Sequence, residues 1–437
     1  MNGSSGEDLT STAVLALLGR AGPMSRAALA RDLGMSPATL TQVTRRLLTQ
    51  GVIEELDRQE PSRGGRRGRL IGLVGSAGRA LGVKVAVDHV ALVDMRLDGR
   101  VTETMTVPFD ATALEAVPAI AELLRPFTES AQGVPPLLGI GVGVPGTVDR
   151  PDSGVVDAAM LNWENVPLGT MLGASLGLAV LVENDVNALG SGERLYGRGR
   201  SLNDFLVVTI GRGVGLAVVA GGHVYRGAHG GAGDFGHVPV DPDGPPCTCG
   251  NRGCLEALIS DDVLLRTARS AGILGEGATP ADLADLANGS DGANGADGSD
   301  GANDSDGAND SGGANDSGGA DDRTATARRI LREAGQLLGR QLAGLATLLD
   351  PQEIVVMGEG TRSWPWWEPG VREAFERHAP RRARELAITV EPYTDTIWAQ
   401  GAAALVLAAS LDGGVGSVDP RRRIHGLGGA AVERSAR

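Results

Sequence analysis

The stretch from Gly231 to Leu258 reads GAGDFGHVPVDPDGPPCTCGNRGCLEAL and holds all three cysteines of the chain. Three thiolates and one imidazole form the ligand set of a closed tetrahedral zinc site, and Gly250 and Gly253 let the backbone turn tightly around an ion. A disulfide plus a free thiol is the alternative, but a C-x-C pair is strained as a disulfide. The stretch therefore predicts one structural Zn²⁺ ion. Its predicted ligands are His237, Cys247, Cys249 and Cys254.

Residues 10–75 predict a winged helix-turn-helix. An apolar helical stripe over residues 11–20 ends at Gly22-Pro23, and Ser25 and Ser36 are good N-caps for two further helices. Residues 52–56 and 70–74 read as two strands joined by a basic, glycine-rich hairpin, which would form the wing.

The third helix of this unit has one polar face whose side chains can reach base edges and phosphates in a major groove. Arginines among the glycines of the wing suit a narrow minor groove, although a solvated charged loop is the alternative. The predicted DNA contacts are Thr39, Gln42, Arg45 and Arg46 on the helix and Arg63, Arg66, Arg67 and Arg69 in the wing.

Length and charge set the remaining bounds. A chain of 437 residues is too long for one ordinary core, so two or three units are expected. The net charge of −14 is uneven: residues 1–80 carry 11 Arg against 7 acids, whereas 288–322 carry nine Asp and no Lys or Arg. Residues 288–322 are therefore predicted to form a disordered acidic insertion without function. The alternative is that this acidic segment discourages non-specific binding of DNA. Neither a membrane span nor a signal peptide is visible, which predicts a cytoplasmic protein.

The stretch from Gly231 also resembles the signature of the ROK family, which contains sugar kinases, transcriptional repressors and uncharacterised frames. The resemblance covers about residues 10–410 apart from the insertion. It implies an α/β protein in which a two-lobed, actin-like ATPase (ribonuclease H-like) sugar-binding domain follows the winged unit. Residues 81–190 would form lobe I, residues 191–411 lobe II with the zinc motif and a closing helix, and 412–437 a loose tail.

The resemblance also implies a sugar site. Asn184-Asp185-Val186-Asn187 resembles the family's ENDxN motif, although an Asx turn after a strand is the alternative. Asp234 stands where the family usually has Glu, so the preferred sugar can differ. The sugar-binding residues carried over from the family are Asn162, Asn184, Asp185, Asp234, His237 and Glu256.

The phosphate loops of the family's kinases are altered. Their first hairpin resembles D-x-G-G-T, whereas this chain has Lys84-Val85-Ala86-Val87-Asp88, and Arg212 replaces a hydroxyl residue in a second glycine-rich segment. Glycine-rich turns between strands are common in α/β folds and need not bind any ligand, which is the alternative for both segments. We therefore expect no enzymatic activity, with Asp185 as a vestigial base, and a sugar kinase is the alternative.

Repressor members carry a winged unit, and kinase members lack one. The expected function is a sugar-responsive repressor of carbohydrate-metabolism genes that binds palindromic operator DNA as a homodimer or homotetramer. Sugar binding without a DNA role is a third hypothesis. For the tryptophans of Trp364–Trp367 we predict either a core-filling role or a subunit contact.

Overall fold

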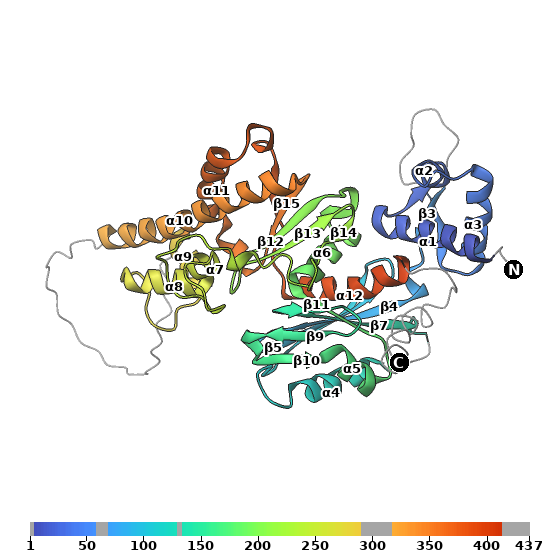
Figure 1. The fold of residues 1–437 in the computed structure, drawn as a ribbon, viewed down its shortest axis with the longest axis horizontal. Helices are drawn as coiled ribbons and strands as arrows, with labels where there is room; N and C mark the ends of the chain where they lie inside the picture. Colours follow the sequence, from blue (N-terminus) through green and yellow to red (C-terminus); the bar gives the residue numbers. More distant parts are fainter. Residues whose placement is uncertain (1–3, 58–68, 129–132, 290–316, 413–437) are drawn as a thin grey trace, which may run out of the picture.

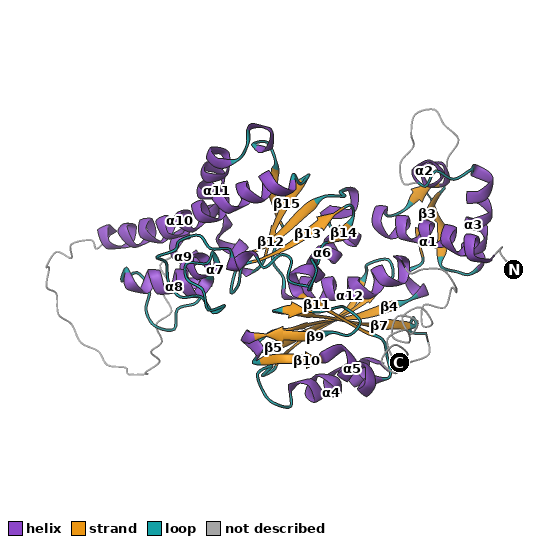
Figure 2. Cartoon of the chain, in the orientation of Figure 1, coloured by secondary structure: helices purple, strands orange, loops and turns teal. Residues whose placement is uncertain are grey.

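The computed structural model describes residues 4–57, 69–128, 133–289 and 317–412. Three units follow one another: a small amino-terminal unit, a first lobe and a second lobe (Figure 1). The predicted fold class is confirmed, since helices and strands alternate in both lobes (Figure 2).

The amino-terminal unit is a winged helix-turn-helix. Its helices are α1 (Ser4–Ala21), α2 (Arg26–Asp32) and α3 (Pro37–Thr49), and its antiparallel sheet has the order β1 (Met24–Ser25), β3 (Leu70–Leu73), β2 (Ile53–Leu56). Both predicted caps are present, because Ser25 Oγ accepts from Ala28 N at 3.2 Å and Ser36 Oγ accepts from Thr39 N at 3.1 Å. Helix α1 begins earlier than the apolar stripe predicts. The predicted wing residues 58–68 lie outside the described residues.

The first lobe is built on a five-stranded sheet in the order β11-β7-β4-β5-β6. Strands β4, β5 and β6 form antiparallel hairpins, while β7 and β11 run parallel to β4. Helices α4 (Ala116–Thr128) and α5 (Leu168–Leu176) pack on one face, and a small sheet β10-β9-β8 lies beside them. The strands are β4 (Arg79–Val85), β5 (His89–Arg96), β6 (Val101–Pro108), β7 (Leu137–Val144), β8 (Thr147–Val148), β9 (Val155–Ala158), β10 (Trp163–Pro167) and β11 (Val180–Asn184).

The second lobe has a five-stranded sheet in the order β14-β13-β12-β15-β16. Its strands are β12 (Phe205–Thr209), β13 (Gly215–Ala220), β14 (His223–Val224), β15 (Glu353–Met357) and β16 (Ala387–Val390). One face carries α7 (Glu256–Ile259), α8 (Asp261–Ser270), α9 (Pro280–Asn288), α10 (Ser317–Leu349) and α11 (Trp364–His378). The other face packs on α6 (Asp185–Tyr196), which therefore lies between the two sheets.

The structure bears on two sequence expectations in this lobe. The insertion predicted as disordered over 288–322 is too long at its carboxyl end, because α10 already begins at Ser317. The tryptophans fill a core: Trp364 and Trp367 are buried between α10 and α11, and Trp366 donates to Asn288 Oδ1 at 3.0 Å. Of the two hypotheses for this cluster, the structure favours the core-filling role.

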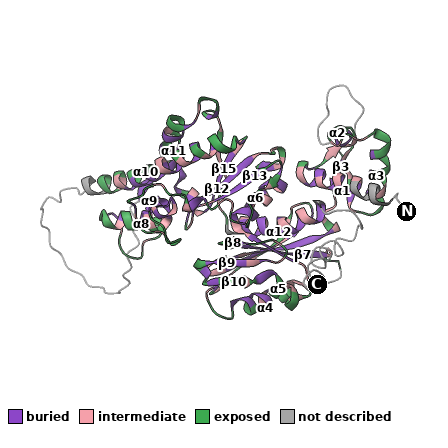
Figure 3. Cartoon of the chain, viewed as in Figure 1, coloured by how far each residue is buried: buried purple, intermediate pink, exposed green. Residues whose placement is uncertain are grey.

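The closing helix α12 (Asp395–Asp412) returns to the first lobe, although the sequence interpretation assigned it to the second. It packs on the sheet so closely that a Cβ at Gly82 would lie 1.8 Å from the Ala399 carbonyl oxygen. Helix α1 of the amino-terminal unit packs against the far end of α12, where a Cβ at Gly19 would lie 2.5 Å from Leu411 Cδ1. One buried apolar core thus joins α1, α12 and the first sheet (Figure 3).

Candidate functional site

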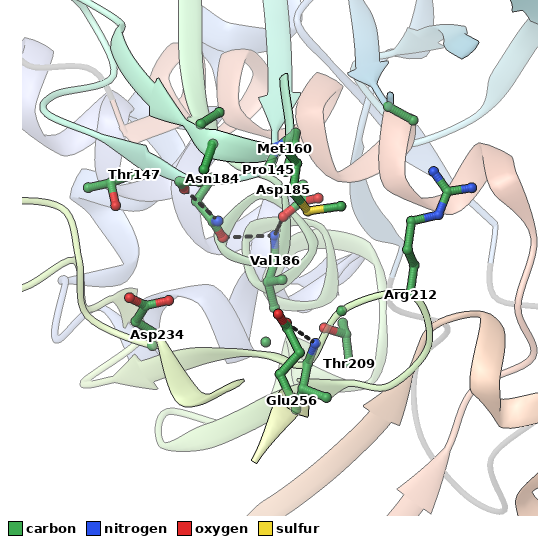
Figure 4. Close-up of a pocket in the computed structure, with 18 of the residues that line it drawn as sticks. Pro145, Thr147, Met160, Asn184, Asp185, Val186, Thr209, Arg212, Asp234 and Glu256 are labelled. Atoms are coloured by element: carbon green, nitrogen blue, oxygen red, sulfur yellow. Dashed lines mark hydrogen bonds between the residues drawn. The ribbon is translucent and has the colours of Figure 1, made fainter. Parts of the chain in front are cut away.

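A cavity of ≈ 380 Å³ lies where the two lobes face each other. From the first lobe it is lined by Lys84, Val87, Asp157, Met160, Asn184 and Asp185. From the second lobe come Arg212, Asp234, His237, Glu256 and Glu359, and Trp398 is contributed by α12. Side chains from elements far apart in the sequence therefore converge on one cleft (Figure 4).

Asp185 begins helix α6, and one of its carboxylate oxygens is bonded to the Lys84 ammonium group. Both side chains are 12% exposed, so this ion pair is largely shielded from water. Lys84 also lies over the Trp398 ring, 4.4 Å from its centroid. The carboxylate that would be the base of a kinase is thus neutralised by a cation from β4.

Asn184 caps helix α6. Its Oδ1 accepts from Val186 N at 3.0 Å and from Asn187 N at 3.1 Å, while its Nδ2 donates to the Gly146 carbonyl at 2.9 Å. This is the Asx-turn geometry that was the alternative to sugar binding at this position. Asn184 nevertheless lines the cavity, which is compatible with sugar binding. Its role in holding a ligand therefore stays a prediction.

Asp234 and Glu256 approach the cavity from the second lobe (Figure 4). Glu256 Oε2 accepts from Val214 N at 3.0 Å, which fixes one of its oxygens. The Asp234 carboxylate is 68% exposed and lies 3.8 Å from His237 Nε2. Hydroxyl groups are good donors to such carboxylates, so this wall can hold a polyhydroxylated ligand.

A second ion pair joins the two lobes beside the cavity. Arg212 follows β12 in the second lobe, and its Nη2 donates to Asp88 Oδ2 of the first lobe at 3.1 Å. The Arg212 guanidinium lowers the pKa of Asp88 to about 2, and His89 Nδ1, 2.8 Å from Asp88 Oδ1, contributes to the same effect. The two positions at which the chain departs from the kinase phosphate loops are therefore joined to each other.

Asn162 does not reach the cavity. It is exposed and has a left-handed backbone with φ 56°, a conformation that asparagine tolerates better than most residues. Sequence reasoning also missed lining residues that belong to no motif, namely Asp157, Met160, Glu359 and Trp398. Isolated residues of these types carry no local signal, so only the fold brings them together.

The four predicted metal ligands converge. Their ligand atoms lie within 4.8 Å of one another, with His237 Nδ1 3.4 Å from Cys247 Sγ and Cys249 Sγ 3.6 Å from Cys254 Sγ. Bonds of about 2.0–2.3 Å in a tetrahedral zinc site place ligands roughly 3.4–3.8 Å apart, so the cluster fits such an ion. All three cysteines are free thiols, contrary to the disulfide alternative.

The metal cluster borders the cavity through His237 and Cys249. Gly253 permits the loop its shape, because φ is +59° and a Cβ there would lie 1.5 Å from the Asp241 carbonyl oxygen. Since His237 Nδ1 faces the thiols and Nε2 faces Asp234, an ion at this position would fix the imidazole against the cavity wall.

The predicted DNA-reading face of α3 is present in part. Thr39, Gln42 and Arg45 are exposed side by side on this helix. Arg46 is half-buried and donates to the Ser11 hydroxyl of α1, which favours a role in holding the two helices together.

The structure also bears on the wing. Arg69 pairs with Glu55 Oε2 at 2.6 Å, and its side chain remains 64% exposed. The other three predicted contacts, Arg63, Arg66 and Arg67, lie outside the described residues.

Comparison with known proteins agrees with this arrangement. Residues 80–298 match the ROK family profile, and residues 8–60 match that of the MarR family. The chain therefore belongs to the ROK family, in the form that carries an amino-terminal winged unit.

Two curated relatives and one solved structure illustrate the similarity. The "Xylose repressor" of Bacillus subtilis is 30% identical over 250 residues, 57% of this chain, so the matched region spans 65% of that relative's length. The "DNA-binding transcriptional dual regulator NagC" of Escherichia coli is 28% identical over 93% of this chain and 94% of its own. A crystal structure described as a ROK family transcriptional regulator, a homolog of the E. coli MLC protein, has a TM-score of 0.71 at 22% identity and covers 93% of this chain and 97% of its own.

Proposed function

We propose that this protein is a sugar-responsive transcriptional regulator, acting as a repressor of carbohydrate-metabolism genes. The observation that carries the proposal is the direct packing of a DNA-reading unit on the two helices that run from the cavity. Helix α6 starts at Asn184-Asp185 and α12 starts beside Trp398, and both contact α1. The names of the curated relatives support the same function.

The link between cavity and DNA-binding unit is short and apolar. Leu15, Leu18 and Leu411 belong to one buried core with Leu195 of α6. Arg200 adds a polar tie, since its Nε donates to the Arg20 carbonyl at 3.2 Å. A sugar that prefers one arrangement of the lobes would therefore shift the arrangement of the winged units, by at most the free energy of that preference.

The cleft supports sugar binding better than phosphoryl transfer. Lys84 occupies the position of the kinase metal-facing carboxylate and holds Asp185, so the base of a kinase would begin the reaction already paired. Arg212, which replaces a hydroxyl residue of the second glycine-rich segment, is itself paired with Asp88. We therefore propose that Asp185 binds sugar hydroxyls without removing a proton from them, and that the protein is not a sugar kinase.

We also propose that the four-residue cluster holds a structural Zn²⁺ ion. His237, Cys247, Cys249 and Cys254 would be its ligands. The ion would hold the loop between β14 and α7 rigid, which keeps His237 and Glu256 directed at the sugar.

We further propose that the protein binds a palindromic operator as a homodimer or homotetramer. Its cytoplasmic location remains a prediction. Among the described residues no helix is long and apolar enough to cross a membrane.

The experiment is a selection of duplexes from a random pool by the full-length protein, followed by binding measurements in rising salt. The proposal expects a recovered sequence with two-fold symmetry and an affinity that falls steeply with salt, because Arg contacts release counterions from DNA. Recovery of no sequence, with salt-independent weak binding, would leave sugar binding without a DNA role as the better account.

A further inference from the structure

The charges around the cavity bear on the chemical class of sugar that it accepts. Five lining carboxylates belong to Asp157, Asp185, Asp234, Glu256 and Glu359, whereas the lining Lys and Arg side chains are Lys84 and Arg212 alone. The lining therefore has an excess of negative charge. An anionic ligand in this cleft would meet a repulsive field.

The two cations are already engaged. Lys84 is bonded to Asp185 inside the cavity, and Arg212 is bonded to Asp88 of the first lobe. Within the described part of the chain, no Lys or Arg forms an ion pair with Asp157, Asp234 or Glu359. A phosphate group would have to break one of two existing pairs to gain a cation.

The amino-terminal end of α6 also offers little to a phosphate. The amino-terminal end of α6 faces the cavity and would normally attract an anion. Its first free amides are already occupied, because Asn184 Oδ1 accepts from Val186 N and Asn187 N. The Asp185 carboxylate adds a negative charge at the same place and also accepts from Val186 N at 2.9 Å.

We propose that the effector is an unphosphorylated sugar, either neutral or carrying an amino group, and that sugar phosphates are rejected by the cavity carboxylates that no described Lys or Arg neutralises. This inference rests on the proposed function and specifies its ligand. Hydroxyl and ammonium groups are donors, so they satisfy Asp234, Glu256 and Asp157 in a way that a phosphate cannot.

The test is calorimetric titration of the full-length protein with matched pairs of ligands. Glucose, mannose and N-acetylglucosamine are each compared with their 6-phosphates, and glucosamine is added as a cationic probe. In whichever pair binds, we expect the unphosphorylated sugar to bind on the order of tenfold or more tightly than its phosphate. Tighter binding of any 6-phosphate than of its parent sugar would overturn the inference.

Substitutions test whether the carboxylates cause the preference for a sugar over its 6-phosphate. Asp234→Asn and Glu359→Gln, singly and together, should narrow the affinity gap between a sugar and its 6-phosphate, while Glu122→Gln on the outer face of α4 should leave the gap unchanged. An unchanged gap in the double variant would also count against the inference. If Asp234→Asn weakens binding of the parent sugar too strongly to be measured, the affinity gap of Glu359→Gln alone still tests the inference.

The outcomes separate this inference from the proposed function. A protein that binds a selected duplex and releases it only with a sugar phosphate would retain the function and lose the inference. A protein that binds neither duplex DNA nor any of the seven ligands would lose both.

Discussion

Replacing Lys84 with Met tests the ion pair at the centre of the cleft. The substitution keeps the length of the side chain and removes its charge, which leaves the Asp185 carboxylate without its cation. Removing one partner of a buried pair typically costs about 3–5 kcal/mol, and because 12% of each side chain is exposed we expect the lower end, about 3 kcal/mol. Loss of the contact with Trp398 acts in the same direction.

The assay is differential scanning calorimetry of wild type, Lys84→Met, Asp185→Asn and the double variant. For a two-lobed domain of about 300 residues, about 3 kcal/mol lowers Tm by roughly 5 °C. The double variant should recover most of that loss, because removing both charges leaves no buried ion unpaired. A Tm for Lys84→Met within about 2 °C of wild type, or effects that simply add in the double variant, would refute the reasoning.

Three further predictions follow from the geometry. Burial, reinforced by the charges of Glu359 and Asp262, raises the pKa of Asp261 to about 6, so stability is lost as the pH rises through that value. Asp261→Asn should therefore raise Tm at pH 7.5 and change it little near pH 4, with Asp285→Asn on the exposed side of α9 as the control. Elemental analysis should find one zinc per chain, and Cys249→Ser should lower both zinc content and Tm; full zinc content in that variant would contradict the ligand assignment. On a selected operator, Arg45→Ala should lower affinity and the salt slope together if it contacts phosphate, whereas Gln42→Ala should relax base preference at one position; equal affinity of both variants and wild type would exclude α3 from the groove.

Local signals predicted the elements that depend on neighbours in the chain. Ser25 and Ser36 were identified as caps because a hydroxyl before an apolar repeat satisfies free helix amides. The metal cluster was predicted equally well, since its three cysteines lie within eight residues and the loop glycines allow them to converge.

Long-range pairing could not be predicted in the same way. Lys84 was recognised as a departure from the kinase loop, but its partner Asp185 lies 101 residues away and only the parallel alignment of β4, β7 and β11 brings them together. The placement of α12 depends on Gly82 in the first sheet, which no pattern around residue 400 reveals. Asn162 shows the converse, because it was carried over from the family as a sugar-binding residue, whereas in the structure it is exposed and does not line the cavity.

Whether a ligand in the cleft changes the affinity of the winged unit for DNA is measured by fluorescence anisotropy of a labelled, selected duplex. The full-length protein is titrated with and without a sugar that calorimetry has shown to bind, at one salt concentration. We expect saturating sugar to change Kd about fivefold or more, the usual lower range of coupling between two sites. An identical Kd with the cavity saturated would contradict the account, because α6 and α12 would then carry no signal from the cleft to α1.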